Sequence, residues 1–210
     1  MAEPRNKSLL VWEPFPYILL IALIILAGSI DPNGAAIPFW IAAAFAAAAT
    51  VFFIIAFASY GRRSRLNPDP AGNLTRLQGI ERLTAGHSDV DGAPVVTVAD
   101  ARRHQQAIEI VRTRGGENAT AILIPRASRW LSRRYRVGVQ LIGGGEVRHA
   151  GFLPDFADER WRDELGALRD SGIFAEVPAR IRGSAQPFSV DLDVSGLAEA
   201  LERHRPEAAA

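Results

Sequence analysis

The sequence contains no cysteine and only one lysine, Lys7, among its 210 residues. The lack of cysteine excludes disulfide bonds, thiolate catalysis and cysteine-type zinc sites. The 23 arginines beside that single lysine, together with the abundant alanine, are typical of a high-GC genome and indicate a bacterial protein. The net charge is only +1, so no global electrostatic field draws the whole chain to nucleic acid.

Charge is also missing from two long stretches in the first part of the chain, residues 14–30 and residues 32–61. A helix that crosses the hydrocarbon core needs about 20 apolar residues, and backbone groups in lipid must be paired within the helix. Residues 31–34 (DPNG) are turn formers that join antiparallel neighbours. We therefore predict a transmembrane helical hairpin over residues 14–61, with helices at about 14–30 and 35–60.

Basic residues flank the hairpin on one side only. Arg5 and Lys7 precede the first apolar stretch, and Arg62, Arg63 and Arg65 follow the second. The positive-inside rule then places both termini in the cytoplasm, with residues 1–13 as an N-terminal tail. The prediction is an integral protein of the bacterial inner (plasma) membrane, with its soluble domain on the cytoplasmic side.

Two other interpretations of the apolar stretches stay open. Ala27, Gly28 and Ser29 resemble a signal-peptide cleavage site, and a buried hairpin of a soluble protein has a similar composition. The alanines of the second stretch, residues 42–44 and 46–49, would let the bulkier first helix pack closely against it. Neither stretch contains an ionisable residue, which argues against a transporter, a proton path or a channel.

The rest of the chain predicts a linker at residues 62–73 and one α+β domain at residues 74–205. Leu74, Leu77, Ile80 and Leu83 share one helical face and predict a short amphipathic helix that ends near Gly86. Strands are predicted at 94–98, 120–124, 135–142, 147–153, 174–181 and 188–194, with a glycine hairpin turn at 143–145. Helices are predicted at 100–112, from 155 to about 170, and after Ser195. This order predicts a small, curved, mostly antiparallel sheet with helices packed against it.

Four segments of this domain resemble the HIRAN-like domain, in particular its bacterial versions, over residues 103–194. The likeness lies in residues 103–107 (RHQQA), 148–154 (RHAGFLP), 177–183 (VPARIRG) and 190–194 (VDLDV). In helicase-associated members of that family the domain grips the end of a DNA strand. The resemblance implies ligand contacts at Arg103 and His104. The family's Asn-Pro-x-Asp-x-Asn-Ala loop is replaced here by residues 127–136.

That replacement segment is the strongest local feature of the sequence. No acidic residue occurs between Glu117 and Glu146, whereas arginines and aromatics alternate there. Such a composition binds phosphates and stacks on bases, and it also suits anionic lipid surfaces. A solvated loop with Trp130 tucked against the sheet remains the plain alternative. The residues predicted to contact an anionic partner are Arg129, Trp130, Arg133, Arg134, Tyr135 and Arg136.

The remaining polar residues predict no chemistry. The four histidines match no metal-binding spacing and are interpreted as isolated, and Asp191 and Asp193 are expected to face solvent on one strand face. We therefore predict no catalytic residue, no cofactor and no metal.

The sequence favours a membrane-tethered, non-enzymatic binding module. Its predicted partners are membrane lipids, and a protein or a nucleic acid for the domain. The alternative is a structural subunit of a larger membrane assembly, in which the alanine-rich helix docks onto other spans.

Overall fold

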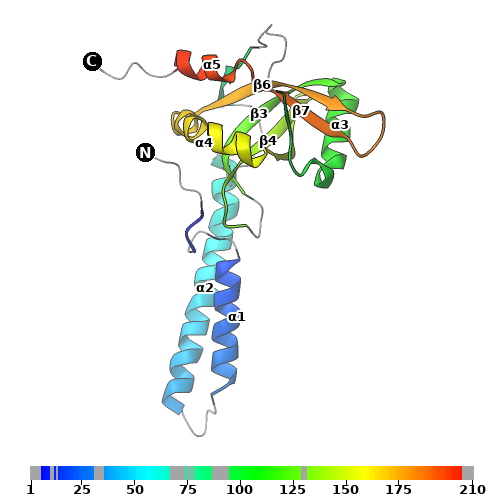
Figure 1. Cartoon of the computed structure of the whole chain (residues 1–210). Coiled ribbons are helices and arrows are strands. Elements are labelled where there is room, and N and C mark those ends of the chain that lie inside the picture. Colours follow the sequence, from blue (N-terminus) through cyan, green and yellow to red (C-terminus); the bar gives the residue numbers. More distant parts are fainter. Residues whose placement is uncertain are drawn as a thin grey trace, which may run out of the picture. The chain divides into compact units, whose positions relative to one another are not determined.

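A computed structural model defines residues 6–9, 12, 14–30, 36–66, 74, 77, 79–86, 95–128 and 132–204. The chain forms two compact units, both drawn in Figure 1. The helical unit consists of residues 6–67 and 129–134. The other unit, the α+β domain, consists of residues 1–5, 68–128 and 135–210.

Two apolar helices, α1 (Phe15–Gly28) and α2 (Ala36–Leu66), lie side by side in the helical unit (Figure 1). The ring of Tyr17 meets that of Phe53 edge-on, with 4.7 Å between the centroids. The less exposed side chains of α2 recur every three or four residues, as one helix face does: Phe39, Ala42, Ala43, Ala46, Ala49 and Phe53. The alanine stripe therefore lies in the face that receives α1, because small side chains allow close approach.

The large apolar side chains of α2 are mostly exposed. Eight of them are more than half exposed: Ile37, Trp40, Ile41, Phe45, Val51, Phe52, Ile54 and Ile55. The segment Ile37–Ile55 is long and apolar enough to cross a membrane, and only 6% of it is buried inside the structure. This exposure is the reverse of what a core helix of a soluble protein shows.

The first helix is shorter than the sequence predicts. α1 has 14 residues, and at 1.5 Å per residue it spans about 21 Å, less than the roughly 30 Å of a hydrocarbon core. The described residues therefore contain one helix of spanning length instead of the predicted two. α2, by contrast, continues to Leu66 into the predicted linker, because arginine favours helix and the first proline after it is Pro68.

The α+β domain contains a mostly antiparallel sheet, as predicted. Its main path runs β2-β7-β6-β3-β4-β5 with antiparallel neighbours, and β1 pairs parallel with β6. Gly144 and Gly145, with φ of +60° and +79°, make the predicted turn between β4 and β5. The strands are β1 (Glu81–Thr84), β2 (Val95–Thr97), β3 (Asn118–Ala127), β4 (Arg136–Gly143), β5 (Glu146–Phe152), β6 (Ile173–Arg182) and β7 (Ser189–Asp193).

Helices cover this sheet and complete its core. α3 packs on β4 and β5, and α4 packs on β3 and β6. Both helices face one large core cluster, to which β3 contributes Ala121 and Leu123. The alternate β3 residues Ile122 and Ile124 enter a second, smaller cluster on the opposite face. The helical elements are the short 3₁₀ turn η2 (Ala101–Arg103), α3 (Gln105–Gly115), α4 (Asp155–Asp170) and α5 (Leu197–His204).

The amphipathic helix predicted around residues 74–86 is wrong. Residues 81–84 form β1, which pairs with β6, and Gly79 has a φ of +83° that no right-handed helix accommodates. Leu74 is instead a buried member of the second cluster, and Leu77 and Ile80 pack against it. A short apolar run has the same composition in a helix and in a strand. The first residues of β6, 173–176, are not paired with β7, and their pairing with residues 81–84 favours the strand.

Candidate functional site

The two ends of the sheet path meet at one point. Ala99, two residues after β2, exchanges backbone hydrogen bonds with Phe152 of β5, at N–O distances of 2.8 and 3.0 Å. Gly151 permits this approach, because a Cβ there would lie 2.2 Å from the Ala99 carbonyl oxygen, and its φ is +146°. The AGF sequence at 150–152 is therefore required by a partner far away in the chain. We call this place the sheet junction.

Two histidines meet at the sheet junction. His104 lies between η2 and α3, and His149 lies on β5 just before a register shift that leaves Ala150 without an opposite residue. Their rings are edge to face, with 4.6 Å between the centroids and an interplanar angle of 86°. The prediction that all four histidines are isolated is thus wrong for this pair. Sequence reasoning missed it because the contact depends on strand closure.

The histidines continue into a row of stacked groups. The His149 ring lies 5.0 Å from that of Phe152, again edge to face. At the other end of the row the guanidinium carbon of Arg136 lies over the Phe152 ring, 5.1 Å from the ring centroid. The junction thus combines two imidazoles, one phenyl ring and one cation in a chain of successive contacts.

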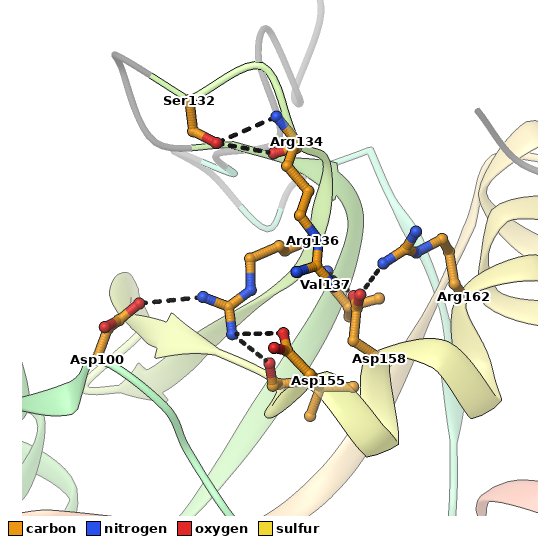
Figure 2. A network of polar contacts seen from close by, with 9 residues as sticks. Asp100, Ser132, Arg134, Arg136, Val137, Asp155, Asp158 and Arg162 are labelled. Carbon is orange, nitrogen blue, oxygen red and sulfur yellow. Dashed lines mark hydrogen bonds and ion pairs between the residues drawn. The ribbon is translucent and has the colours of Figure 1, made fainter. Parts of the chain in front are cut away.

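Arg136 is held by the protein itself. It forms ion pairs with Asp100 at 3.2 Å and with Asp155 at 3.6 Å, and it donates a hydrogen bond to the Leu153 carbonyl at 3.0 Å (Figure 2). Its side chain is 17% exposed. Asp100 has a φ of 65°, a left-handed conformation that is uncommon outside glycine. The helix predicted to begin at residue 100 is replaced there by the short turn η2, and the Asp100 carboxylate pairs with Arg136 instead of capping a helix.

Burial keeps the histidine pair neutral. Desolvation, followed by the neighbouring His104, lowers the pKa of His149 to about 4. Desolvation also lowers the pKa of His104, with a smaller contribution from the positive charge of Arg103. The buried Nδ1 of His149 has no hydrogen-bond partner among the described residues. At neutral pH the junction therefore presents uncharged imidazoles, which stack well but cannot form ion pairs.

Among the residues that the structure describes, no group of three or more histidines, carboxylates or cysteines could hold a metal ion. The junction contains the two imidazole rings of His104 and His149, and the η2 turn runs directly into His104. Arg102 and Arg103 of η2 are exposed there.

The predicted arginine run is divided between the two units. Arg129 and Trp130 lie outside the described residues. Arg133 and Arg134 belong to the helical unit, whereas Tyr135 and Arg136 belong to the α+β domain. The predicted run is therefore shared between two units, and Arg136 has partners within the α+β domain.

Several acids that look solvent-exposed in the sequence are buried. Asp191 accepts a hydrogen bond from Thr97 Oγ1 at 2.7 Å and pairs with Arg182, which corrects the prediction that it faces solvent. Asp158, in the first turn of α4, is fully buried. Its carboxylate accepts a hydrogen bond from the Val137 amide at 2.6 Å and forms an ion pair with Arg162 (Figure 2). Both carboxylates are internal supports of the domain.

An open pocket of about 460 Å³ lies between α3 and the loop that joins β6 to β7, a site for which the sequence contains no signal. Arg112 covers the Phe188 ring at 5.1 Å and donates to the Ser184 carbonyl at 3.1 Å. Glu109 and Gln186 face each other across it at 2.7 Å. These polar groups bind one another and hold the loop on α3.

The described residues define an α+β domain with a mostly antiparallel sheet, joined to an apolar helix pair. Searches against protein-family models, curated proteins and solved structures found no match to this chain.

Proposed function

We propose that the protein is a membrane-tethered, non-enzymatic binding module. The α1–α2 hairpin is its anchor in the bacterial inner membrane, and the α+β domain is its cytoplasmic recognition unit. The observation that carries this proposal is the exposed apolar face of α2. Each large apolar side chain moved from water to lipid contributes about 1.5–3 kcal/mol. Eight such side chains on one helix favour lipid over water by a wide margin.

Both helices enter the membrane together in this proposal. α1 is short, but Tyr17 and Trp12 suit the headgroup level on its N-terminal side. The basic residues before α1 and after residue 61 support cytoplasmic termini. The same exposed face of α2 would also suit docking onto other spans, as the structural-subunit alternative requires.

We assign the binding face of the domain to the sheet junction. Arg103 and His104 are the positions that the HIRAN-like resemblance implies, and His149 adds a second ring. Aromatic rings beside arginines bind single-stranded nucleic acid by stacking, at roughly 1–3 kcal/mol for each base. The favoured ligand is therefore the end of a nucleic-acid strand.

The absence of cysteine makes the membrane topology directly testable. Ser29→Cys, after α1, and Glu202→Cys, in α5, each give the full-length protein one thiol. In intact cells a membrane-impermeant maleimide should label the Ser29→Cys protein but not the Glu202→Cys protein, and inverted vesicles should reverse the pattern. Release of the protein from membranes by alkaline carbonate, or labelling of both variants in intact cells, would contradict the anchor.

Binding at the sheet junction is tested separately. The full-length protein in neutral nanodiscs is titrated with labelled single-stranded and duplex oligonucleotides. Arg103→Gln and His104→Ala should each weaken strand-end binding about tenfold, if one stacked or ion-paired contact is lost. His204→Ala, an exposed histidine of α5, is the matched control. Equal binding by all variants would assign the ligand to another surface.

A further inference from the structure

The segment before α1 pairs with the connection between β3 and β4. Asn6 and Arg134 form an antiparallel bridge, and the Lys7 amide donates to the Arg133 carbonyl at 2.6 Å. The Arg133 guanidinium returns two hydrogen bonds to the Lys7 carbonyl, from Nε at 3.4 Å and from Nη2 at 3.2 Å. This pairing explains why residues 129–134 group with the helices although they interrupt the domain.

The pairing lies at a defined end of the hairpin. The residue 6–9 arm leads into α1 through the hydrogen bonds from Trp12 to Leu9 and from Phe15 to Trp12. α1 and α2 pack side by side, and Tyr17 near the start of α1 meets Phe53 of α2, so α2 continues past the start of α1 to Leu66 (Figure 1). Arg133 and Arg134 are thus carried to the end where the apolar helix α1 begins.

The basic residues of the helical unit are concentrated in three segments of its sequence. The only acidic residues in its sequence are Glu13 and Asp31. Its basic residues either precede α1, follow Gly61 or come from the β3–β4 connection: Lys7, Arg62, Arg63, Arg65, Arg129, Arg133 and Arg134. The whole chain has a net charge of only +1, so the α+β domain is acidic by difference. A basic unit attached to an acidic domain is complementary to an anionic membrane surface.

We propose that Arg133 and Arg134 bind the phosphate groups of anionic phospholipids, so that the β3–β4 connection is a second attachment of this chain to the membrane surface. This inference rests on the proposed membrane anchor. Both arginines are exposed, whereas Lys7 is buried and holds Arg133 through its backbone. A guanidinium has five N–H donors in a planar fork that matches phosphate oxygens. Two of the donors of Arg133 hold Lys7, and the other three have no partner among the described residues.

Lipid is favoured over nucleic acid at these two arginines for a structural reason. Bases are bound by stacking on rings, and the row of stacked rings at the sheet junction belongs to the α+β domain, whereas Arg133 and Arg134 belong to the unit that carries the apolar helices. Arg133 and Arg134 supply charge at the start of an apolar helix, which is the arrangement of a juxtamembrane basic segment. The β3–β4 connection therefore acts as a membrane contact rather than as part of the ligand site.

The test uses the full-length protein in nanodiscs. A bimane fluorophore on Ser8→Cys, an exposed position of the arm, reports lipids that carry a nitroxide on the headgroup. Labelled phosphatidylglycerol should quench it more than labelled phosphatidylcholine when each is a minor component of phosphatidylcholine discs. Arg133→Gln and Arg134→Gln should each reduce that preference about fivefold, the equivalent of about 1 kcal/mol for each arginine. Arg180→Gln with Arg203→Gln, two exposed arginines of the domain, is the matched control.

The outcomes separate this inference from the anchor. Equal quenching by the two lipids, or a preference that survives the double Arg133→Gln/Arg134→Gln variant, overturns the lipid contact while the protein stays in the disc. Failure of the protein to co-elute with discs overturns the anchor itself. Loss of oligonucleotide binding in the double variant with the lipid preference intact assigns the two arginines to nucleic acid and also overturns the inference.

Discussion

The ring of His104 rests edge-on against the ring of His149, with 4.6 Å between their centroids. One histidine precedes α3 and the other belongs to β5, and the Ala99–Phe152 bridge brings the two segments together. No carboxylate contributes to the lowered pKa of either histidine. Protonation of this pair therefore opposes the closed sheet instead of reinforcing it.

The first prediction is a loss of stability at acidic pH. The pKa of His149 is about 4 in the folded protein and 6.5 as a model value, so the unfolded chain binds more protons between these limits. The stabilisation is complete above pH 6.5 and is lost as the pH falls to 4, by about 3 kcal/mol in total. Urea unfolding at a series of pH values, followed by circular dichroism, measures this loss.

His149→Asn tests that assignment. The variant removes the titrating group, so its free energy of unfolding should change less between pH 6.5 and 4 than that of the parent. His204→Ala, which removes an exposed histidine, should keep the parental profile. A profile for His149→Asn that superimposes on the parental one would assign the acid sensitivity to other groups.

The second prediction concerns Gly151. An added Cβ would lie 2.2 Å from the Ala99 oxygen and 2.8 Å from a Val98 methyl carbon, so Gly151→Ala must open the bridge. Overpacking of this kind costs about 1–3 kcal/mol, and the positive φ adds strain. Gly86→Ala is the control, because a Cβ there meets nothing within 4 Å. Chemical denaturation of both variants gives the comparison, and equal stabilities would contradict the tight junction.

The sequence predicts local structure well at such positions but not their partners. The alternation in residues 147–153 predicts a strand, and the glycines at 144 and 145 predict its turn. The local sequence does not show that the Ala99 carbonyl approaches Gly151 too closely for a Cβ, or that His149 contacts His104. Both contacts form only when the two ends of the sheet path meet. The local sequence thus predicts the helices and strands, whereas the contacts of the sheet junction depend on the pairing of segments that are distant in the chain.

The same limit explains the two clearest errors. Residues 81–84 have apolar neighbours at helical spacing, yet β6 offers them an unpaired edge that a single sequence does not display. Asp191 alternates with apolar residues and looks exposed, but Thr97 and Arg182 satisfy its carboxylate in place of water. Both outcomes depend on a neighbour that is distant in the chain.

The third prediction concerns the buried Asp158. Asp158→Asn keeps the size of the side chain but removes the charge that pairs with Arg162, whose side chain is also buried. Removal of one partner from a buried ion pair costs about 3–5 kcal/mol. Glu159→Gln, an exposed change at the next position of α4, should alter stability by less than about 0.5 kcal/mol. Thermal unfolding of the two variants distinguishes them, and similar melting temperatures would rule out a structural role for the pair.

The last prediction separates Arg136 from Arg103, two arginines that the sequence proposes as ligand contacts. Arg136 binds Asp100, Asp155 and the Leu153 carbonyl, so Arg136→Gln weakens the pairing of the partly buried Asp100 and of the buried Leu153 carbonyl. It should lower the free energy of unfolding by about 1–3 kcal/mol and leave the affinity of the folded protein for oligonucleotides unchanged. Arg103→Gln changes an exposed residue and should do the reverse, weakening binding without loss of stability. Each variant therefore needs both measurements, with affinity corrected for the folded fraction. A stable Arg136→Gln protein that has lost its ligand would show that this guanidinium leaves its internal partners to reach the bound strand.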